Sequence, residues 1–343
     1  MPEITKQIPL LHPDGTITEE GWARQPHWIY NKNNIAASKL RIKEWDYYSV
    51  LSPDKKFGIT ITTSDLGYAG LFAICFLDFN TGKFSQIDTL SILPLGKTNL
   101  PLVHSEGIVE FEDKKLKIRF ETKNRIRNLE FESKNFISPT GQKGIKGKIQ
   151  LTEPKMDSMN IVTSWKENRK AFYYNTKVNC MPANGSFMIG DQTFSFDPKY
   201  DFGALDWGRG VWTYKNRWYW SSVSAYIDGK PFGLNLGYGF TDRTPASENV
   251  IFYDGKIHKL DEVTFQINTK NYLEPWKFVS NNQRLTLDFQ PIVDRNSYMN
   301  FLIIKTEQHQ VFGTFNGEVV LDDGKILKLK NILGFAEDVL NWY

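Results

Sequence analysis

The sequence predicts an all-β protein built from antiparallel hairpins. Short segments alternate apolar and polar side chains, as in residues 116–120 (LKIRF) and 285–289 (LTLDF). Such alternation places one set of side chains in a core and the other toward water, which is typical of antiparallel sheets. Asp-Gly pairs at 228–229, 254–255 and 323–324 separate strand-like segments and supply the positive φ angles of tight hairpins. Several hairpins at short spacing favour a barrel or a sandwich.

The composition agrees with a folded β protein. Apolar residues make up 41% of the 343 residues and charged residues 24%, which is ordinary for a globular chain with a real core. Aromatic residues reach 14%, with 10 Trp, 15 Tyr and 24 Phe. Strands favour aromatic residues, and aromatic side chains also form the walls of ligand sites. Composition alone leaves both roles open.

Helical signals are few, and one stretch suggests a boundary. Short helices are expected at 18–24, with Thr18 as N-cap, and at 335–342. The stretch 170–191 breaks the alternation and contains Pro182 and an Asn-Gly turn. We therefore predict two β units of similar length, residues 1–175 and 176–343.

Several classes of protein are disfavoured by the sequence. The net charge of +3 and the mixing of lysines with glutamates between 114 and 148 indicate solvated strand faces rather than a nucleic-acid footprint. Cys75 and Cys180 form neither a metal motif nor a disulfide framework, and no phosphate-binding glycine loop points to a cofactor. The N-terminus lacks a signal-peptide core and no stretch suits a membrane helix, so a cytoplasmic protein without membrane insertion is expected. No metal site is predicted, because no metal-binding spacing links the five histidines, His12, His27, His104, His258 and His309.

Candidate site residues are most frequent in residues 206–249. The middle of this region is predicted to form a hairpin that turns at 228–231. Pairing across this turn puts large indoles on one face, together with hydroxyls, an amide and glycines: Trp218, Trp220, Ser222, Ser224, Gly233, Asn235, Gly237 and Gly239. The other face is apolar core. Glycines within strands mark the close approach of a ring, another backbone or a ligand. Either the indoles simply cover the glycines, or this face lines a cavity with Ser222, Ser224 and Asn235 as its polar groups.

Charged residues flank the hairpin on both sides. We consider Asp206, Arg209, Asp242 and Glu248 as candidate catalytic residues, since paired carboxyls can divide acid and base duties. Arg209 and Arg217 could clamp a carboxylate or phosphate. The alternatives are that Asp206 pairs with an arginine to fix a loop, and that Asp242 and Glu248 are solvated turn residues. The candidate ligand-binding residues are Trp207, Trp212, Tyr214, Arg217, Trp218, Trp220, Ser222, Asn235 and Asn249.

These blocks resemble a known bacterial family, the domain-of-unknown-function 2804 (DUF2804) family. The resemblance rests on NCMPANGSFMIGDQTFSFDP, FGALDWGRGVW, GLNLGYGFTDRTPASENVIFYDGKIHKL and FGTFNGEVVLDDGKILKLKNILGFAEDV, and it spans nearly the whole chain. Thr213 stands where the family pattern suggests proline. The resemblance implies two lipocalin-like β-barrel or half-barrel units, distantly similar to hydroxyneurosporene synthase and AttH-type proteins. Such proteins hold apolar ligands between or inside two barrels, which is fold-level analogy.

Three functions remain open at this point. The first is binding of an apolar, lipid- or isoprenoid-like small molecule, with hydration, isomerisation or cyclisation as the chemistry of an enzyme. The second is a carbohydrate-binding or carbohydrate-active protein that uses Trp and Tyr stacking and a carboxyl pair. The third is a non-catalytic stress or scaffold protein with a filled core. The sequence does not decide whether the chain is an enzyme or what its oligomeric state is.

Overall fold

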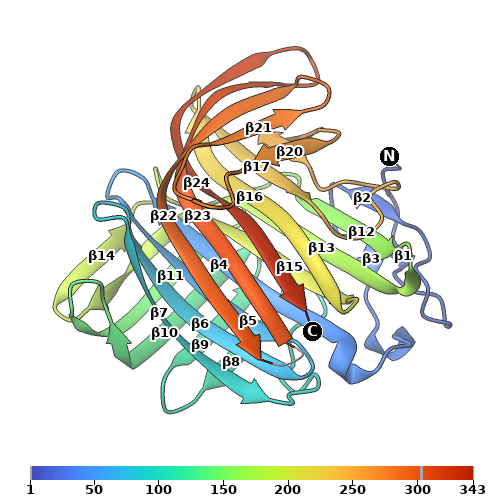
Figure 1. The fold of residues 1–343 in the computed structure, drawn as a ribbon, viewed down its shortest axis with the longest axis horizontal. Helices are drawn as coiled ribbons and strands as arrows, with labels where there is room; N and C mark the ends of the chain where they lie inside the picture. Colours follow the sequence, from blue (N-terminus) through green and yellow to red (C-terminus); the bar gives the residue numbers. More distant parts are fainter. Residues whose placement is uncertain (1, 302–303, 343) are drawn as a thin grey trace.

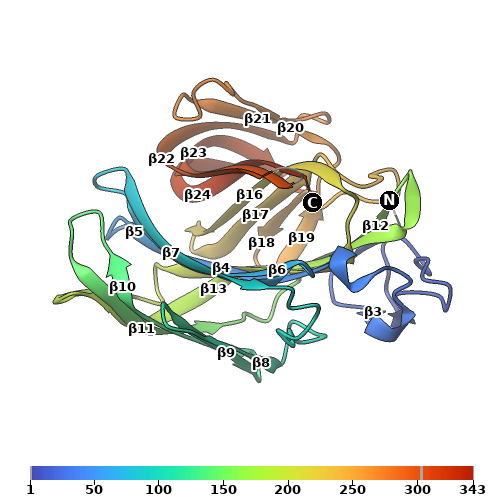
Figure 2. The same cartoon turned by 60° about the horizontal axis from the view of Figure 1, so that its bottom comes forward.

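The computed structural model describes residues 2–301 and 304–342, and two curled antiparallel sheets dominate it (Figures 1 and 2). This confirms the predicted all-β class with two half-barrel units. The first sheet follows the order β7 (Lys83–Ile92), β6 (Ala69–Asp78), β5 (Phe57–Asp65), β4 (Ile42–Ser52), β15 (Phe202–Val211), β13 (Asn168–Ile189), β11 (Lys143–Thr152), β10 (Ile126–Ile137), β9 (Lys117–Lys123) and β8 (Gly107–Glu112). Three further strands attach to it, β12 (Met159–Trp165), β14 (Gln192–Phe196) and β2 (Gly21–Ala23).

The second sheet is formed by the C-terminal third of the chain and stacks on the first (Figure 2). Its order is β19 (Lys256–Lys259), β18 (Val250–Tyr253), β17 (Lys230–Tyr238), β16 (Lys215–Ile227), β24 (Ile326–Trp342), β23 (Ile304–Val320), β22 (Leu285–Phe301), β21 (Trp276–Ser280) and β20 (Val263–Gln266). The remaining elements are a short parallel pair, β1 (Ile8–Pro9) with β3 (Trp28–Ile29), and two 3-10 helices, η1 (Lys32–Asn34) and η2 (Lys39–Arg41). No helix among the described residues has the length and apolar character needed to cross a membrane.

The predicted hairpin turns are observed. Asp228 (φ 53°) and Gly229 (φ 71°) join β16 to β17 as a two-residue turn, and Asp254 (φ 50°) and Gly255 (φ 83°) do the same between β18 and β19. Positive φ at both central residues gives the turn a twist that matches the flanking strands. The loop around Gly324 is longer, because β23 and β24 close their pairing at Val320 and Ile326.

Both predicted helices are wrong. Residues 21–23 form β2, and residues 335–342 lie in β24. β24 pairs with β16 on one side and with β23 on the other, so it is a central strand. Consecutive residues 333–339 are all buried, so both of its faces are covered there. Such a strand shows little polar–apolar alternation, which is why the segment FAEDVLNW resembled a short helix.

The break in alternation at 170–191 has a structural cause. Residues 170–189 of this stretch lie within β13, and the register with β15 shifts between Val178 and Met181, where Cys180 has φ 57°. At this bulge Nδ2 of Asn179 donates to Oγ of Ser222 (2.9 Å) and to two carbonyl oxygens of the second sheet (3.0 and 3.2 Å). The chain itself passes from the first sheet to the second between β15 and β16. The division into domains at 175/176 stays a prediction.

The core consists of three apolar clusters. One fills the first half-barrel and one the second. The third lies between the sheets and includes Tyr47, Trp220, Val293, Phe312 and Phe335. The two sheets therefore bury apolar surface against each other, and the polar groups described below are embedded at this junction.

The bulge gives a test of how the sheets are joined. We expect Asn179→Ala to lower the free energy of unfolding by about 2 kcal/mol, because buried acceptors of the second sheet lose their donor. Urea unfolding would measure the change. Asn184→Ala, on an exposed position of the same strand, serves as the matched control and should stay within about 0.5 kcal/mol of the wild type. Equal effects of both substitutions would contradict a joining role for Asn179.

Candidate active site between the two sheets

Two rows of polar side chains face each other across the junction of the sheets. In the first sheet Lys177, Asp206 and Tyr47 are direct cross-strand partners on β13, β15 and β4. In the second sheet the row is Trp220, Glu337, Gln310 and Arg295, on β16, β24, β23 and β22. The rows touch, since Nζ of Lys177 lies 4.0 Å from the centre of the Trp220 ring and Nε2 of Gln310 donates to the Tyr47 hydroxyl at 2.8 Å.

A buried ion pair stands at the centre of the first row. Nζ of Lys177 lies 2.9 Å from Oδ1 of Asp206 and 3.9 Å from Oε2 of Glu248. Nδ2 of Asn175 also donates to Oδ1 of Asp206, at 2.6 Å. The Lys177 and Glu248 side chains are 4% and 6% exposed, whereas Asp206 keeps 11%. Buried charges are costly unless they are paired, so this lysine is what allows the carboxylates to lie here.

Glu248 is held by an amide and fits against a glycine. Nδ2 of Asn235 donates to Oε2 of Glu248 at 3.2 Å, while Oδ1 of Asn235 accepts from Nε1 of Trp220 at 2.8 Å. A β-carbon at Gly237 would lie 2.3 Å from Oε1 of Glu248, so only glycine leaves room for the carboxyl. Burial raises the pKa of Glu248, and Lys177 opposes this only in part.

Glu337 is the second carboxyl with an altered acidity. Oε1 accepts from Nε2 of Gln310 at 2.5 Å, and Oε2 accepts from Nε1 of Trp218 at 3.3 Å. Burial raises its pKa to about 7, against the hydrogen bond from Trp218 and the charge of Lys177. A carboxyl that titrates near neutral pH can both donate and accept a proton, as general acid–base chemistry requires.

Five of the residues singled out in the sequence meet at this cluster. They are Asp206, Trp218, Trp220, Asn235 and Glu248. The pairing of the 228–231 hairpin is as predicted, with Trp220 opposite Gly237, Ser222 opposite Asn235 and Ser224 opposite Gly233.

Two further residues near the cluster have their polar groups engaged elsewhere. Ser222 accepts from Asn179, and Asn249 accepts from the backbone N–H of Gly237 (2.8 Å) while it donates to the carbonyl of Asp261 (2.8 Å). Both residues therefore support the local backbone.

Three other candidates, Trp207, Arg209 and Arg217, lie on the strand faces that point away from the cluster. Arg209 is three positions from Asp206 within β15, an odd spacing that turns it to the interior of the first half-barrel. There it binds Asp46 (3.0 Å), and its guanidinium lies over the Trp207 ring at 4.2 Å. Arg217 likewise points away from the cluster and pairs with Asp338 at 2.6 Å.

The last three candidates are also outside the cluster. Asp242 pairs with Arg169 at 3.0 Å. Burial alone would raise the pKa of Asp242, but hydrogen bonds from Thr244 and Arg169 outweigh it and lower the pKa to about 2. Trp212 packs in an aromatic group, 5.7 Å from Trp45 and 5.4 Å from Trp218 between ring centres. Tyr214 is exposed. The structure thus gathers five of the predicted site residues, leaves Ser222 and Asn249 beside them with their polar groups engaged, and places the other six elsewhere.

Sequence reasoning missed the partners that complete the cluster. Lys177 is a lone charge in the long run AFYYNTKVNCM, and a buried lysine in such a run is a usable signal. Glu337 was hidden in a segment that resembled a helix. Gln310 lies 263 positions from Tyr47 and 27 from Glu337. Arg295 lies 209 positions from Gln86. Contacts over such separations give no local signal in the sequence. Among residues 2–301 and 304–342, no group of three or more His, Cys, Asp or Glu side chains is placed to hold a metal ion.

The two curled antiparallel half-barrel sheets match the fold of two lipocalin-like units. The chain belongs to the DUF2804 family, a domain of unknown function, whose model matches residues 1–343. No curated protein matches the sequence.

Solved structures share the fold at low identity. A structure of CghA with Sch210972 has a TM-score of 0.54 at 12% identity, and kievitone hydratase from Nectria haematococca has 0.52 at 10%; each match covers 88% of both chains. A Nitrosomonas europaea protein assigned as an AttH has 0.52 at 11% identity, over 90% of this chain and 95% of the other. The expected relation to lipocalin-like AttH-type proteins is confirmed at the level of fold.

Glu337 makes stability depend on pH in a defined sense. Its pKa in the folded chain, about 7, lies above the ordinary 4.5, so the folded state binds the proton more tightly. The stabilising contribution is full below about pH 4.5 and is lost as the pH rises through 7, a loss of roughly 3 kcal/mol. We expect the fall in unfolding free energy between pH 5 and pH 8 to be smaller in Glu337→Gln than in the wild type.

Urea unfolding at the two pH values would measure this difference. Glu318→Gln, an exposed glutamate of β23, is the matched control and should keep the wild-type pH dependence. An unchanged fall in Glu337→Gln would show that this carboxyl titrates normally.

Proposed function

We propose that this protein binds a small organic molecule between its two sheets and transfers a proton on it. The observation that carries the proposal is the buried set of Glu248, Glu337 and the Lys177–Asp206 pair against the rings of Trp220 and Tyr47. Buried carboxyls with raised pKa values beside a specific charge partner are characteristic of catalytic sites. A purely structural core would avoid the cost of burying these groups.

The arrangement suits addition of a proton to a carbon–carbon double bond. Glu337 in its acid form would give its proton to one alkene carbon, which leaves positive charge on the other. The Tyr47 ring would stabilise that charge. A water molecule would then attack the cationic carbon and lose its proton to the Asp206 carboxylate, which completes hydration. Loss of a proton from a neighbouring carbon would complete isomerisation instead.

Two further considerations support this choice over the alternatives. One protein of this fold is a hydratase, so the fold is compatible with addition of water to an organic molecule. Stacking of a sugar needs an accessible indole face, whereas Trp220 is 7% exposed and its face is occupied by Lys177. The apolar, unsaturated substrate class is therefore preferred to a carbohydrate.

The proposal predicts a conversion that depends on two carboxyls. The chain would be incubated with a small-molecule extract of the organism that encodes it, and mass spectrometry would seek a substrate and product that differ by one water or not at all in mass. We expect Asp206→Asn with Glu337→Gln to slow the conversion at least about a hundredfold, the range of general acid–base catalysis. Asp288→Asn, at an exposed position of β22, should convert at the wild-type rate. The absence of any conversion and of any bound small molecule in the wild type would refute the proposal.

A further inference from the structure

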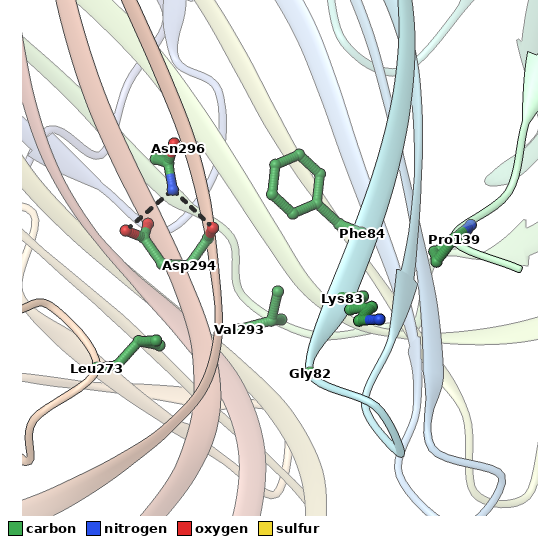
Figure 3. A pocket seen from close by; sticks show the side chains of 8 residues that line it. All are labelled: Gly82, Lys83, Phe84, Pro139, Leu273, Val293, Asp294 and Asn296. Carbon is green, nitrogen blue, oxygen red and sulfur yellow. Dashed lines mark hydrogen bonds between the residues drawn. The ribbon is translucent and has the colours of Figure 1, made fainter.

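A hollow opens where the edges of the two sheets approach each other (Figure 3). Its volume is about 380 Å³, within the range of small-molecule sites. The start of β7 with the glycine before it and the middle of β22 supply most of its walls, together with one residue each from the β10–β11 and β20–β21 connections: Gly82, Lys83, Phe84, Pro139, Leu273, Val293, Asp294 and Asn296.

Two residues of the hollow belong to the apolar cluster between the sheets. Phe84 and Val293 point toward each other across the gap, and both pack in the apolar cluster that contains Tyr47 and Trp220. Asp294 and Asn296 stand on the other side of β22 (Figure 3). The packed side chains of this cluster thus link the apolar residues of the hollow to Tyr47 and Trp220.

One step further along the same two edges lies an arginine that bridges the sheets. Arg295 follows Val293 by two positions and Gln86 follows Phe84 by two, so each pair shares a strand face. Nε and Nη2 of Arg295 donate to Oε1 of Gln86 at 2.9 and 2.8 Å, and Nη1 donates to Oε1 of Gln310 at 2.6 Å. Gln310 in turn donates to Glu337, so one hydrogen-bonded amide separates this guanidinium from the proposed acid.

Arg295 differs in its partners from Arg209 and Arg217. Arg209 and Arg217 each bind a carboxylate, whereas Arg295 has no carboxylate oxygen within 4.0 Å in the described part of the chain. Lys83 adds a second positive charge at the hollow, and the carboxylate of Asp294 is paired with Nδ1 of His309 at 2.8 Å. The Arg295 guanidinium, between β7 and β22, is therefore a cation whose charge is not neutralised by a neighbouring side chain.

We propose that Arg295 anchors the carboxylate of an amphipathic organic acid whose apolar body enters past Phe84 and Val293 toward Trp220. The inference rests on the proposed function and names its substrate class. Gln86 is exposed, so a ligand carboxylate can replace its amide oxygen at little cost and gain a bidentate, charge-assisted contact. With its carboxylate held there, the ligand presents the carbons of its chain to Glu337.

Binding of a fluorescent fatty acid and its methyl ester tests this assignment. The full chain would be titrated at pH 7.5 with dansylaminoundecanoic acid and with the uncharged ester of the same compound. We expect the acid to bind at least about tenfold more tightly than the ester, since only the acid can form the charge-assisted contact with Arg295. Arg295→Gln should remove this preference and leave the affinity for the ester unchanged.

Two variants and the ester separate the possible outcomes. Arg119→Gln, on β9 with Glu110 and Glu121 as partners, is the matched control and should bind like the wild type. Arg295→Lys keeps the charge and should retain part of the preference for the acid. If either Arg295 variant loses the ester as well, the arginine is structural and the inference is overturned.

The same titration distinguishes this inference from the proposed function. Equal affinity of the wild type for acid and ester overturns the anchor and leaves the proton-transfer proposal to its own turnover assay. Failure of both compounds to bind overturns the anchor too, and if no conversion is found in that assay either, the proposed function fails with it.

Discussion

The candidate site depends on one constraint: ionisable groups that are buried together must compensate one another without water. Lys177 lies 2.9 Å from Asp206 and 3.9 Å from Glu248, and the effective penalty for an unpaired ion here would be several kcal/mol. One lysine does not neutralise every carboxyl of the cluster. Glu248 and Glu337 therefore hold their protons more tightly than exposed glutamates do. The desolvation that lowers the stability of the fold is the same effect that gives Glu337 an acidity near neutral pH.

The two sheets make this burial possible because each contributes a complete row of side chains. Direct cross-strand pairing aligns Lys177, Asp206 and Tyr47, and the pairing of the second sheet aligns Trp220 with Glu337. The bulge at Asn179 joins the two sheets at their junction. Gly237 leaves the space that the Glu248 carboxyl fills. A shift of one residue in either sheet would turn a row to the opposite face, so register is as necessary to the site as residue identity.

The sequence could predict what depends on local pairing and not what depends on distant pairing. The turn at Asp228–Gly229 determines which residues share a face, so the surface of Trp220 and Asn235 was predicted from parity alone. Arg209 was grouped with Asp206 because DWGRG resembled a loop; in a strand, a spacing of three puts the two on opposite faces. Glu337 joins Trp220 only because β24 pairs with β16 across more than a hundred residues, and no local pattern specifies that partner.

The polarity of the cluster also narrows what a ligand must be. An apolar molecule alone would leave the Lys177–Asp206 pair and Glu337 without improved partners, whereas a fully polar one would gain little from Trp220, Tyr47 and Phe84. A molecule with both characters fits the two environments. The protonation of Glu337 depends on the charge at Arg295. Burial raises the pKa of Glu337, and the positive charge of Arg295 acts against that rise. An anion beside Arg295 would offset this charge and favour the protonated form of Glu337. Binding of the ligand carboxylate to Arg295 would therefore itself keep the proton donor protonated.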